Sequence, residues 1–226
     1  MAASDVLSIW NNAILDIGAK TQIAAITEQS AEAAACALKY RDVVEDIIRK
    51  TDWGCLRTRV ALIEASAGAV WPPSWEYMFY YPTNCFAIRG FDIGALGLPR
   101  ILPVTEVPFE LGFDSIGTRV LYMNMLCNVV VFTQYNYDPL EGYFEAMFDA
   151  SLRKAVSAAL GAAVAGPLTG NAGIVQQARQ AAVIALEEAK AANGNEAAPV
   201  DLTHAEAESL AVRGYTYCDY PSYRWR

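Results

Sequence analysis

The first hydrophobic pattern in the chain has the period of an amphipathic helix. Apolar side chains recur at steps of three and four residues, which places them on one helix face; they are Val6, Trp10, Ile14 and Ile17. Asp5 is a residue type that can cap a helix, and Gly18 can end one. We therefore expect a helix at residues 5–18.

A second helical pattern begins at Ser30, which belongs to the residue types preferred at a helix N-cap. Its apolar positions have the same spacing; they are Ala33, Ala37, Tyr40, Val44 and Ile47. This pattern predicts a helix at residues 30–51. Because both stripes are apolar, we expect the two helices to lie antiparallel and to share a core.

The middle of the chain changes to short runs rich in aromatic and β-branched residues, which are typical of strands. These runs lie at residues 75–81, 86–91, 109–113, 118–123 and 128–137. They predict a small antiparallel sheet or meander within a β region of about 75–137. Residues 57–64 fit a strand or a short helix. Residues 92–108 fit a long apolar loop, which either folds over its own sheet or contacts a partner subunit.

Helical periodicity returns after Asp138-Pro139, an N-cap residue followed by proline at the first helical position. The pattern predicts helices at about 139–165 and 172–193, separated by Gly166-Pro167. Many alanines in both segments would let the helices approach closely. The expected fold class is mainly α with a small antiparallel β region: a four-helix bundle core, a β meander and an extended C-terminal arm.

Composition then restricts the class of protein. The 226 residues are 54% hydrophobic and 19% charged, which excludes intrinsic disorder for most of the chain and suggests apolar surface for assembly. The net charge of −8 argues against sequence-nonspecific clamping of nucleic acid. We expect no signal peptide, because the N-terminus lacks a basic region followed by an apolar one. We expect no membrane association either, because the longest apolar stretch, 155–168, is too short to span a bilayer.

Residues that could carry chemistry are few. The five cysteines are widely spaced, which predicts reduced thiols in a cytosolic setting, and the single histidine is His204. Without paired Cys and His ligands we expect no metal, and without a nucleotide fingerprint we expect no cofactor. A glycosidase-like carboxylate pair is conceivable among Glu28, Glu32, Asp42 and Glu45. Ion pairs on solvated helix faces explain these residues better, so we expect no enzyme.

The last part of the chain, residues 198–226, differs from the rest and is expected to form a C-terminal arm next to a main domain at 1–197. Its end is rich in tyrosine, tryptophan and arginine, a composition typical of interface hot spots. We interpret it as an extended arm that docks on a partner; the alternative is that it folds back onto the chain's own surface. The candidate docking residues are Arg213, Tyr215, Tyr217, Tyr220, Tyr223, Arg224, Trp225 and Arg226.

The order of short motifs along the chain resembles the head-to-tail adaptors of short-tailed phages, also called tail tubular protein A or head-to-tail connector proteins. The resemblance covers roughly residues 6–197. The segments that carry it are Asn11–Gly18 (NNAILDIG), Tyr40–Asp42 (YRD), Thr51–Trp53 (TDW), Tyr81–Cys85 (YPTNC), Thr133–Pro139 (TQYNYDP) and Pro167–Gly170 (PLTG).

The resemblance implies a structural virion protein. Proteins of this family form a ring of twelve copies between the portal protein and the tail nozzle protein, and the ring continues the channel for passing DNA. Their C-terminal extension reaches the portal, a role that would here fall to residues 213–226. The net negative charge would suit a channel wall that repels phosphate. Two other functions stay open: a cell-wall glycan hydrolase, and a helical regulator that binds a host protein through its tail.

Overall fold

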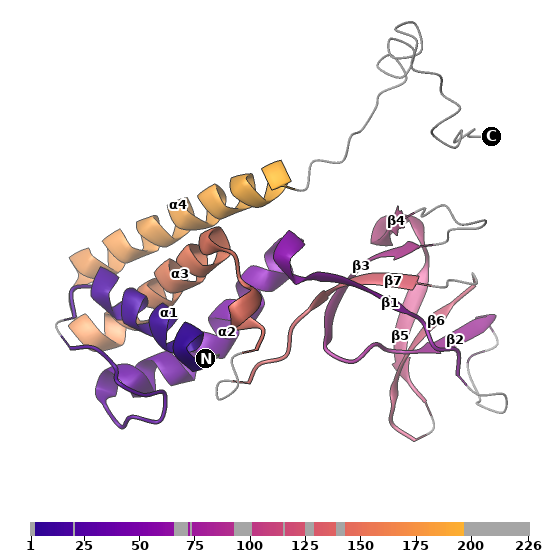
Figure 1. Ribbon diagram of the computed structural model, residues 1–226, viewed down its shortest axis with the longest axis horizontal. Helices are drawn as coiled ribbons and strands as arrows, with labels where there is room; N and C mark the ends of the chain where they lie inside the picture. Colours follow the sequence, from indigo (N-terminus) through magenta and orange to yellow (C-terminus); the bar gives the residue numbers. More distant parts are fainter. Residues whose placement is uncertain are drawn as a thin grey trace, which may run out of the picture.

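A computed structural model shows a helical part and a β part side by side (Figure 1). The residues described are 3–19, 21–65, 72, 74–92, 101–114, 116–124, 129–138 and 143–196. The expected C-terminal arm, with all eight candidate docking residues, lies outside them. The β part adjoins the end of the helical part at which α2 and α4 finish (Figure 1).

The helical part is built around one central helix. Its four helices are α1 (Ala3–Asp16), α2 (Ala31–Lys50), α3 (Ala150–Thr169) and α4 (Ala172–Glu196). Helix α3 makes extensive contacts with each of the other three, whereas α1 and α2 touch each other little. The apolar stripes of α1 and α2 therefore share a core mainly through α3.

Helix α2 begins as its sequence predicts. Ser30 is the N-cap, and its hydroxyl oxygen accepts a hydrogen bond from the backbone N–H of Ala33 at 3.3 Å. This bond satisfies one of the N–H groups that a helix start leaves without a partner. After α1, Gly18 adopts a φ of +84°, a conformation that glycine reaches without the steric cost of a Cβ.

The expected start of the third helix at Asp138-Pro139 is wrong. Helix α3 begins at Ala150, and its N-cap is Asp149, whose carboxylate accepts from Leu152 N at 2.6 Å. The preceding residues form a short 3₁₀ helix, η3 (Glu145–Met147). Aromatic rings on either side of η3 pack against Tyr135, so this segment folds onto the end of the last strand instead of extending α3.

Helix α3 also ends later than expected, because Pro167 does not stop it. The helix continues to Thr169, and Gly170 then adopts a left-handed conformation with a φ of +61°. Gly170 donates its N–H to the carbonyl of Gly166 at 3.0 Å, which closes the last turn. Pro167 has no N–H to donate, and the helix continues for only two residues beyond it.

Helices α1 and α3 cross at very short range. A Cβ placed on Gly161 would lie 2.9 Å from the carbonyl oxygen of Ala13, closer than real Cβ contacts. Glycine at this position therefore allows the two backbones to touch. The small residues of α3 permit the close packing that its alanines predict.

The β part contains a four-stranded and a three-stranded antiparallel sheet. The first has the order β1-β7-β3-β4 and the second the order β2-β6-β5. The strands are β1 (Arg57–Ala61), β2 (Tyr77–Tyr80), β3 (Cys85–Asp92), β4 (Ile101–Pro103), β5 (Phe109–Phe113), β6 (Arg119–Met123) and β7 (Val129–Gln134). Two further 3₁₀ helices, η1 (Gly54–Leu56) and η2 (Val104–Glu106), precede β1 and follow β4.

The two sheets share a small core of their own. Phe91, Val130 and Phe132 of the first sheet pack with Phe79 and Leu121 of the second. The chain after β1 links the sheets, because residues 63–65 pair with β2: Ala65 N donates to Met78 O, and Tyr80 N donates to Ile63 O.

The expected fold class is therefore wrong. The β part is not a minor meander attached to a four-helix bundle, since its seven described strands form two sheets with a separate core. Residues 57–61 form a strand, which resolves the open choice there. Part of the expected loop at 92–108 is β4 and η2. The physical reason is long-range pairing, which periodicity within one segment does not reveal.

Candidate functional site

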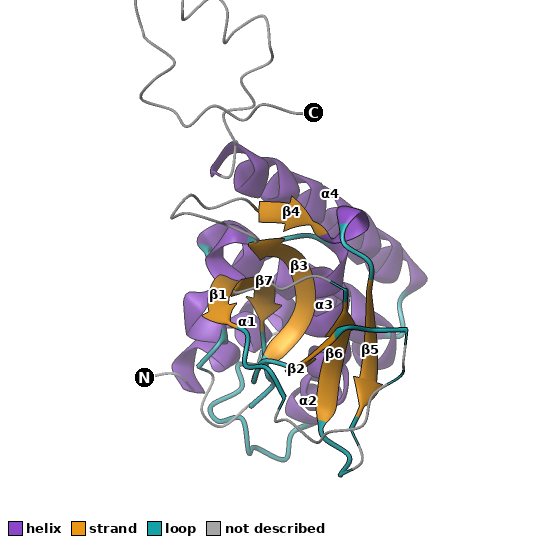
Figure 2. Ribbon diagram, turned by 90° about the vertical axis from the view of Figure 1, so that its right-hand side faces the viewer, coloured by secondary structure: helices purple, strands orange, loops and turns teal. Residues whose placement is uncertain are grey.

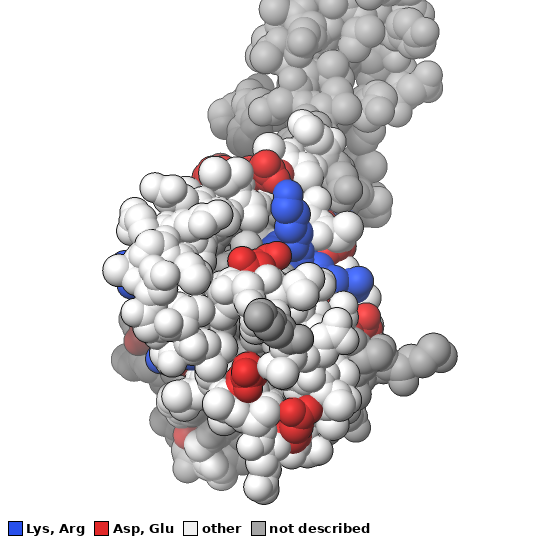
Figure 3. Space-filling model, turned by 90° about the vertical axis from the view of Figure 1, so that its left-hand side faces the viewer, with Lys and Arg blue, Asp and Glu red and all other residues white. Residues whose placement is uncertain are grey.

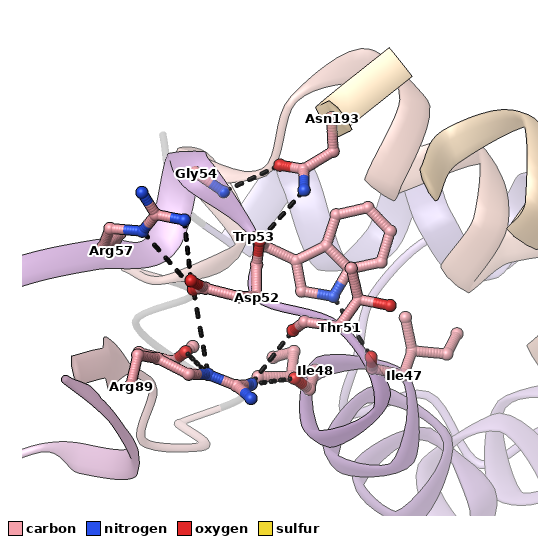
Figure 4. Close-up of polar contacts among 10 residues, drawn as sticks. Ile47, Ile48, Thr51, Asp52, Trp53, Gly54, Arg57, Arg89 and Asn193 are labelled. Atoms are coloured by element: carbon pink, nitrogen blue, oxygen red, sulfur yellow. Dashed lines mark hydrogen bonds and ion pairs between the residues drawn. The ribbon is translucent and has the colours of Figure 1, made fainter. Parts of the chain in front are cut away.

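Polar side chains meet where the helical part joins the β part, and Figure 4 shows this cluster. We call it the polar joint and define it by Asp52, Arg57, Arg89 and Asn193. Asp52 follows the end of α2, Arg57 begins β1, Arg89 lies in β3 and Asn193 lies in the last turn of α4. Four separate elements of the chain therefore meet at one place.

Arg89 attaches β3 to the end of α2. Its Nη2 donates to the carbonyl oxygens of Ile48 at 2.9 Å and Thr51 at 3.0 Å, and its Nε donates to Thr133 Oγ1 at 2.8 Å. These carbonyls belong to the helix end, where backbone acceptors have no partner within the helix. A cation at this end also interacts favourably with the helix dipole.

The carboxylate of Asp52 partly offsets the effect of burial on the pKa of Arg89. Partial burial lowers the pKa of the Arg89 guanidinium, and the nearby carboxylate of Asp52, with Oδ1 3.7 Å from Arg89 Nε, raises it. Asp52 also forms an ion pair with Arg57, at 2.6 Å from Nη2 to Oδ2. One carboxylate thus pairs with cations from two strands of the same sheet.

Asn193 fixes the end of α4 to the same joint. Its Oδ1 accepts from the N–H of Gly54 at 2.8 Å, and its Nδ2 donates to the carbonyl of Asp52 at 2.9 Å. Asn193 is buried, and both partners lie about 140 positions earlier in the chain. The expected helix stop at Asn193 is therefore wrong, because α4 continues to Glu196 and uses this side chain as a bridge.

A buried carboxyl group lies in the helical part, at Glu145 in η3. Its Oε1 accepts from the hydroxyl of Tyr135 at 3.1 Å, and no part of the residue is exposed. Burial raises the pKa of Glu145, and the hydrogen bond from Tyr135 acts in the opposite direction. Trp10 and Tyr40, from α1 and α2, pack edge to face beside this group. Because Glu145 is fully buried among these side chains, we assign the cluster to structure.

The carboxylates considered for glycosidase chemistry organise a loop and a helix surface. Glu28 accepts from Ala24 N at 2.7 Å, and this bond lowers the pKa of Glu28. Glu32 accepts from Thr21 at 3.2 Å, and both carboxylates line a hollow of about 230 Å³. A general acid needs a raised pKa instead. Glu45 forms an ion pair with Arg41, and Asp42 is exposed.

Two buried thiols do not have the properties of nucleophiles. Cys36 and Cys85 form no disulfide, and burial raises the pKa of each to about 11. A thiol with such a pKa stays protonated at neutral pH and is a weak nucleophile. Two further cysteines and His204 lie outside the described residues.

The part of the chain that the structure describes contains neither a metal-ligand cluster nor a membrane-spanning helix. No three His, Cys, Asp or Glu side chains there come together as metal ligands. None of the helices there has the length and apolar character needed to cross a membrane.

Large apolar side chains exposed to solvent are the most prominent surface feature of the described residues. They occur on both parts of the molecule, and at several of them more than half of the side chain is exposed. They are Leu15, Leu38, Val60, Ile63, Leu111, Phe113, Ile116, Tyr143, Val183 and Ile184. The far end of the helical part is also mostly uncharged, with scattered acidic and basic side chains (Figure 3).

The polar joint was not predicted from the sequence. Asp52, as part of the Thr51–Trp53 motif, was singled out only through the family resemblance. Arg89 and Asn193 carry no local signal, because their partners are backbone groups of distant segments. The signal in the sequence is Arg89 itself, a charged residue in the mainly apolar strand β3, because a partly buried charge needs partners.

The chain matches no family model and no curated protein. The resemblance to phage head-to-tail adaptors therefore stays a prediction from the motifs.

Proposed function

We propose that this protein is a structural adaptor of a phage virion, which forms a ring between the portal and the tail nozzle and continues the DNA ejection channel. The observation that carries the proposal is the set of large apolar side chains left exposed on both the helical and the β part. A subunit with neighbours on two sides buries such residues in the assembly. The order of motifs supports the same function.

The polar joint supports a mechanical role. Arg89 of β3 binds the end of α2 through two hydrogen bonds, and Asn193 binds the end of α4 to the segment between α2 and β1 through two more. A ring that transmits contacts from a portal to a nozzle needs subunits whose two parts keep a fixed geometry. Satisfied polar groups at the joint supply that geometry, because breaking any of them leaves partly buried donors or acceptors without partners.

The net charge of −8 fits the proposed channel. Acidic side chains on a channel wall repel phosphate, so DNA can pass without specific binding. Hydrogen bonds from Ala24 N to Glu28 and from Thr21 to Glu32 give these two carboxylates a structural role in the loop before α2, which does not favour the hydrolase alternative.

Binding of the portal by the full chain and by a chain truncated after Ala198 tests the proposal. Cosedimentation with the portal encoded in the same genome should capture the full chain, and the truncated chain should bind roughly tenfold more weakly or worse, the loss expected when a hot-spot contact is removed. The truncated chain should keep its melting temperature, because the cores of both described parts lie before residue 197. Failure of the full chain to bind this portal would contradict the proposal.

Single substitutions in the arm refine the test. If Tyr220 and Trp225 are buried anchors on the portal, Tyr220→Ala and Trp225→Ala should each reduce binding by about 2 kcal/mol, as hot-spot truncations do. Ser222→Ala, which removes only a hydroxyl from the same segment, is the matched control. Equal binding by all three variants would exclude Tyr220 and Trp225 as anchors of the contact.

A further inference from the structure

Only two of the four sheet edges remain open among the described residues. Residues 63–65 cover the outer side of β2. Strand β4 has three residues and ends at Pro103, which has no N–H to donate. Strands β1 and β5 are the other edges, and no described strand pairs with their outer sides.

The two open edges face opposite sides of the β part. Viewed toward the β part, β1 lies at its left border and β5 at its right border (Figure 2). A contact between two different surfaces of a subunit is heterologous, and it repeats from copy to copy until the rotation closes a ring. The placement of β1 and β5 is therefore suited to ring formation.

Strand β5 separates apolar and acidic side chains on its two faces. Leu111 pairs with Leu121 of the core between the sheets, so Leu111 and Phe113 belong to the inner face. They are nevertheless 39% and 70% exposed. Glu110 lies on the outer face and is also exposed. The strand contains no lysine or proline, the residues that commonly protect an edge from pairing.

Strand β1 has the complementary arrangement. Val60 pairs with Val130 of the same core, which places Val60 on the inner face, and it is 42% exposed. Arg59 lies on the outer face and is exposed. Both strands are five residues long. If the sheet continued from β5 into β1, apolar side chains would meet on one face and opposite charges on the other.

We propose that β5 of one copy pairs with β1 of the next copy, and that this strand addition joins neighbouring subunits in the ring. Backbone hydrogen bonds between the two edges supply the contact, as in other cases of β-augmentation. With the two strands parallel, Leu111 meets Val60 on the inner face and Glu110 meets Arg59 on the outer face. The inference rests on the proposed ring function and specifies the contact between its subunits.

Charge reversal with mixing tests this contact. Arg59→Glu and Glu110→Arg each place like charges across every junction, and each alone should weaken association by about tenfold per contact. An equimolar mixture of the two variants should restore rings. When the variants alternate, the introduced glutamate meets the introduced arginine at one junction and the native pair meets at the next. The double variant should also assemble. Arg179→Glu, an equal charge change on exposed α4, should have no effect.

Two measurements give the readout: ring-bearing portals counted by negative-stain microscopy, and association of the chain alone by sedimentation velocity. Glu110 also accepts a hydrogen bond from Trp75 Nε1 at 2.9 Å, so circular dichroism must show that Glu110→Arg is folded. Glu110→Gln, which can still accept this bond, should weaken association by a smaller factor.

The outcomes separate this inference from the proposed function. Wild-type rings on the portal that neither reversal weakens would overturn the edge contact and leave the adaptor function intact. Loss with Glu110→Arg alone would mean that Glu110 does not face Arg59, which also overturns it. Wild-type association in solution that follows the mixing pattern, without rings on the portal, would support the contact and contradict the adaptor function. No wild-type association in either measurement would overturn both.

Discussion

The helical part and the β part bury their apolar residues in different ways. The helical part has one continuous core that receives side chains from all four helices, among them Trp10, Tyr40 and Leu160. The β part divides its buried residues between a core that joins the two sheets and a smaller cluster around Met78 and Tyr122. It also leaves Phe113 and Ile116 exposed at the β5–β6 hairpin.

This difference indicates a division of roles. A single large core makes the helical part the stable body of the subunit, since stability grows with the apolar area removed from water. Open edges and exposed apolar side chains make the β part the surface that assembly completes. The polar joint holds one part to the other.

Substitution of Trp53 should have the largest effect. This residue follows α2, is fully buried in the helical core and donates from Nε1 to Ile47 O at 3.1 Å. Trp53→Ala should reduce the free energy of unfolding by about 3–5 kcal/mol, as measured by urea denaturation. Trp75→Ala, at a half-buried residue of the β part, is the control and should cost clearly less. Equal costs would contradict the comparison between the two parts.

The close crossing of α1 and α3 gives a second prediction. Gly161→Ala would place a Cβ 2.9 Å from Ala13 O and should destabilise the protein by about 1–3 kcal/mol. Gly194 is also helical, in α4, and a Cβ there meets nothing within 4 Å. Gly194→Ala should therefore stabilise by about 0.5–1 kcal/mol. Thermal unfolding of both variants checks the opposite signs, and a neutral Gly161→Ala would exclude the close crossing.

Loss of the bridge from α4 should have a smaller effect on stability. Asn193→Ala leaves Gly54 N and Asp52 O without their partners, and both can be reached by water after a small opening. We expect a cost of about 1 kcal/mol and faster amide hydrogen exchange at Gly54. Asn195→Ala, at an exposed position two residues further along α4, is the matched control. Unchanged exchange at Gly54 would contradict the bridge.

The buried carboxyl group gives a prediction about pH. Burial raises the pKa of Glu145 in the folded state, so the folded protein holds this proton more tightly than the unfolded chain. Stability from this group is present below the unfolded pKa of about 4.3 and falls as pH rises toward the folded pKa. Glu145→Gln should remove this fall and be more stable than wild type above the folded pKa. Asp42→Asn is the exposed control, and parallel pH profiles of wild type and Glu145→Gln would refute the prediction.

Helix α2 shows what the sequence predicts well. Its apolar stripe and the Ser30 cap are local signals, and the helix spans Ala31–Lys50 against an expected 30–51. The strand at residues 109–113 has the bounds that its β-prone run predicts. The bounds of these two elements follow from signals within their own segments, although β5 also needs β6 as its partner.

The start of α3 shows where local signals fail. Asp138-Pro139 and Asp149 are both plausible N-caps, and the choice between them depends on packing of η3 against Tyr135. Sheet order fails for the same reason, because β1 pairs with β7 about 70 positions later. The polar joint joins residues even further apart, so neither its members nor the open edges follow from periodicity. The docking residues expected in the arm stay a prediction.

Electron microscopy of the protein mixed with the portal from the same genome tests the central claim most directly. The account predicts an additional ring of subunits stacked on one end of the portal, with the central channel continuing through it. Portals without an added ring beside unbound protein, at concentrations well above those used for binding, would contradict the adaptor function.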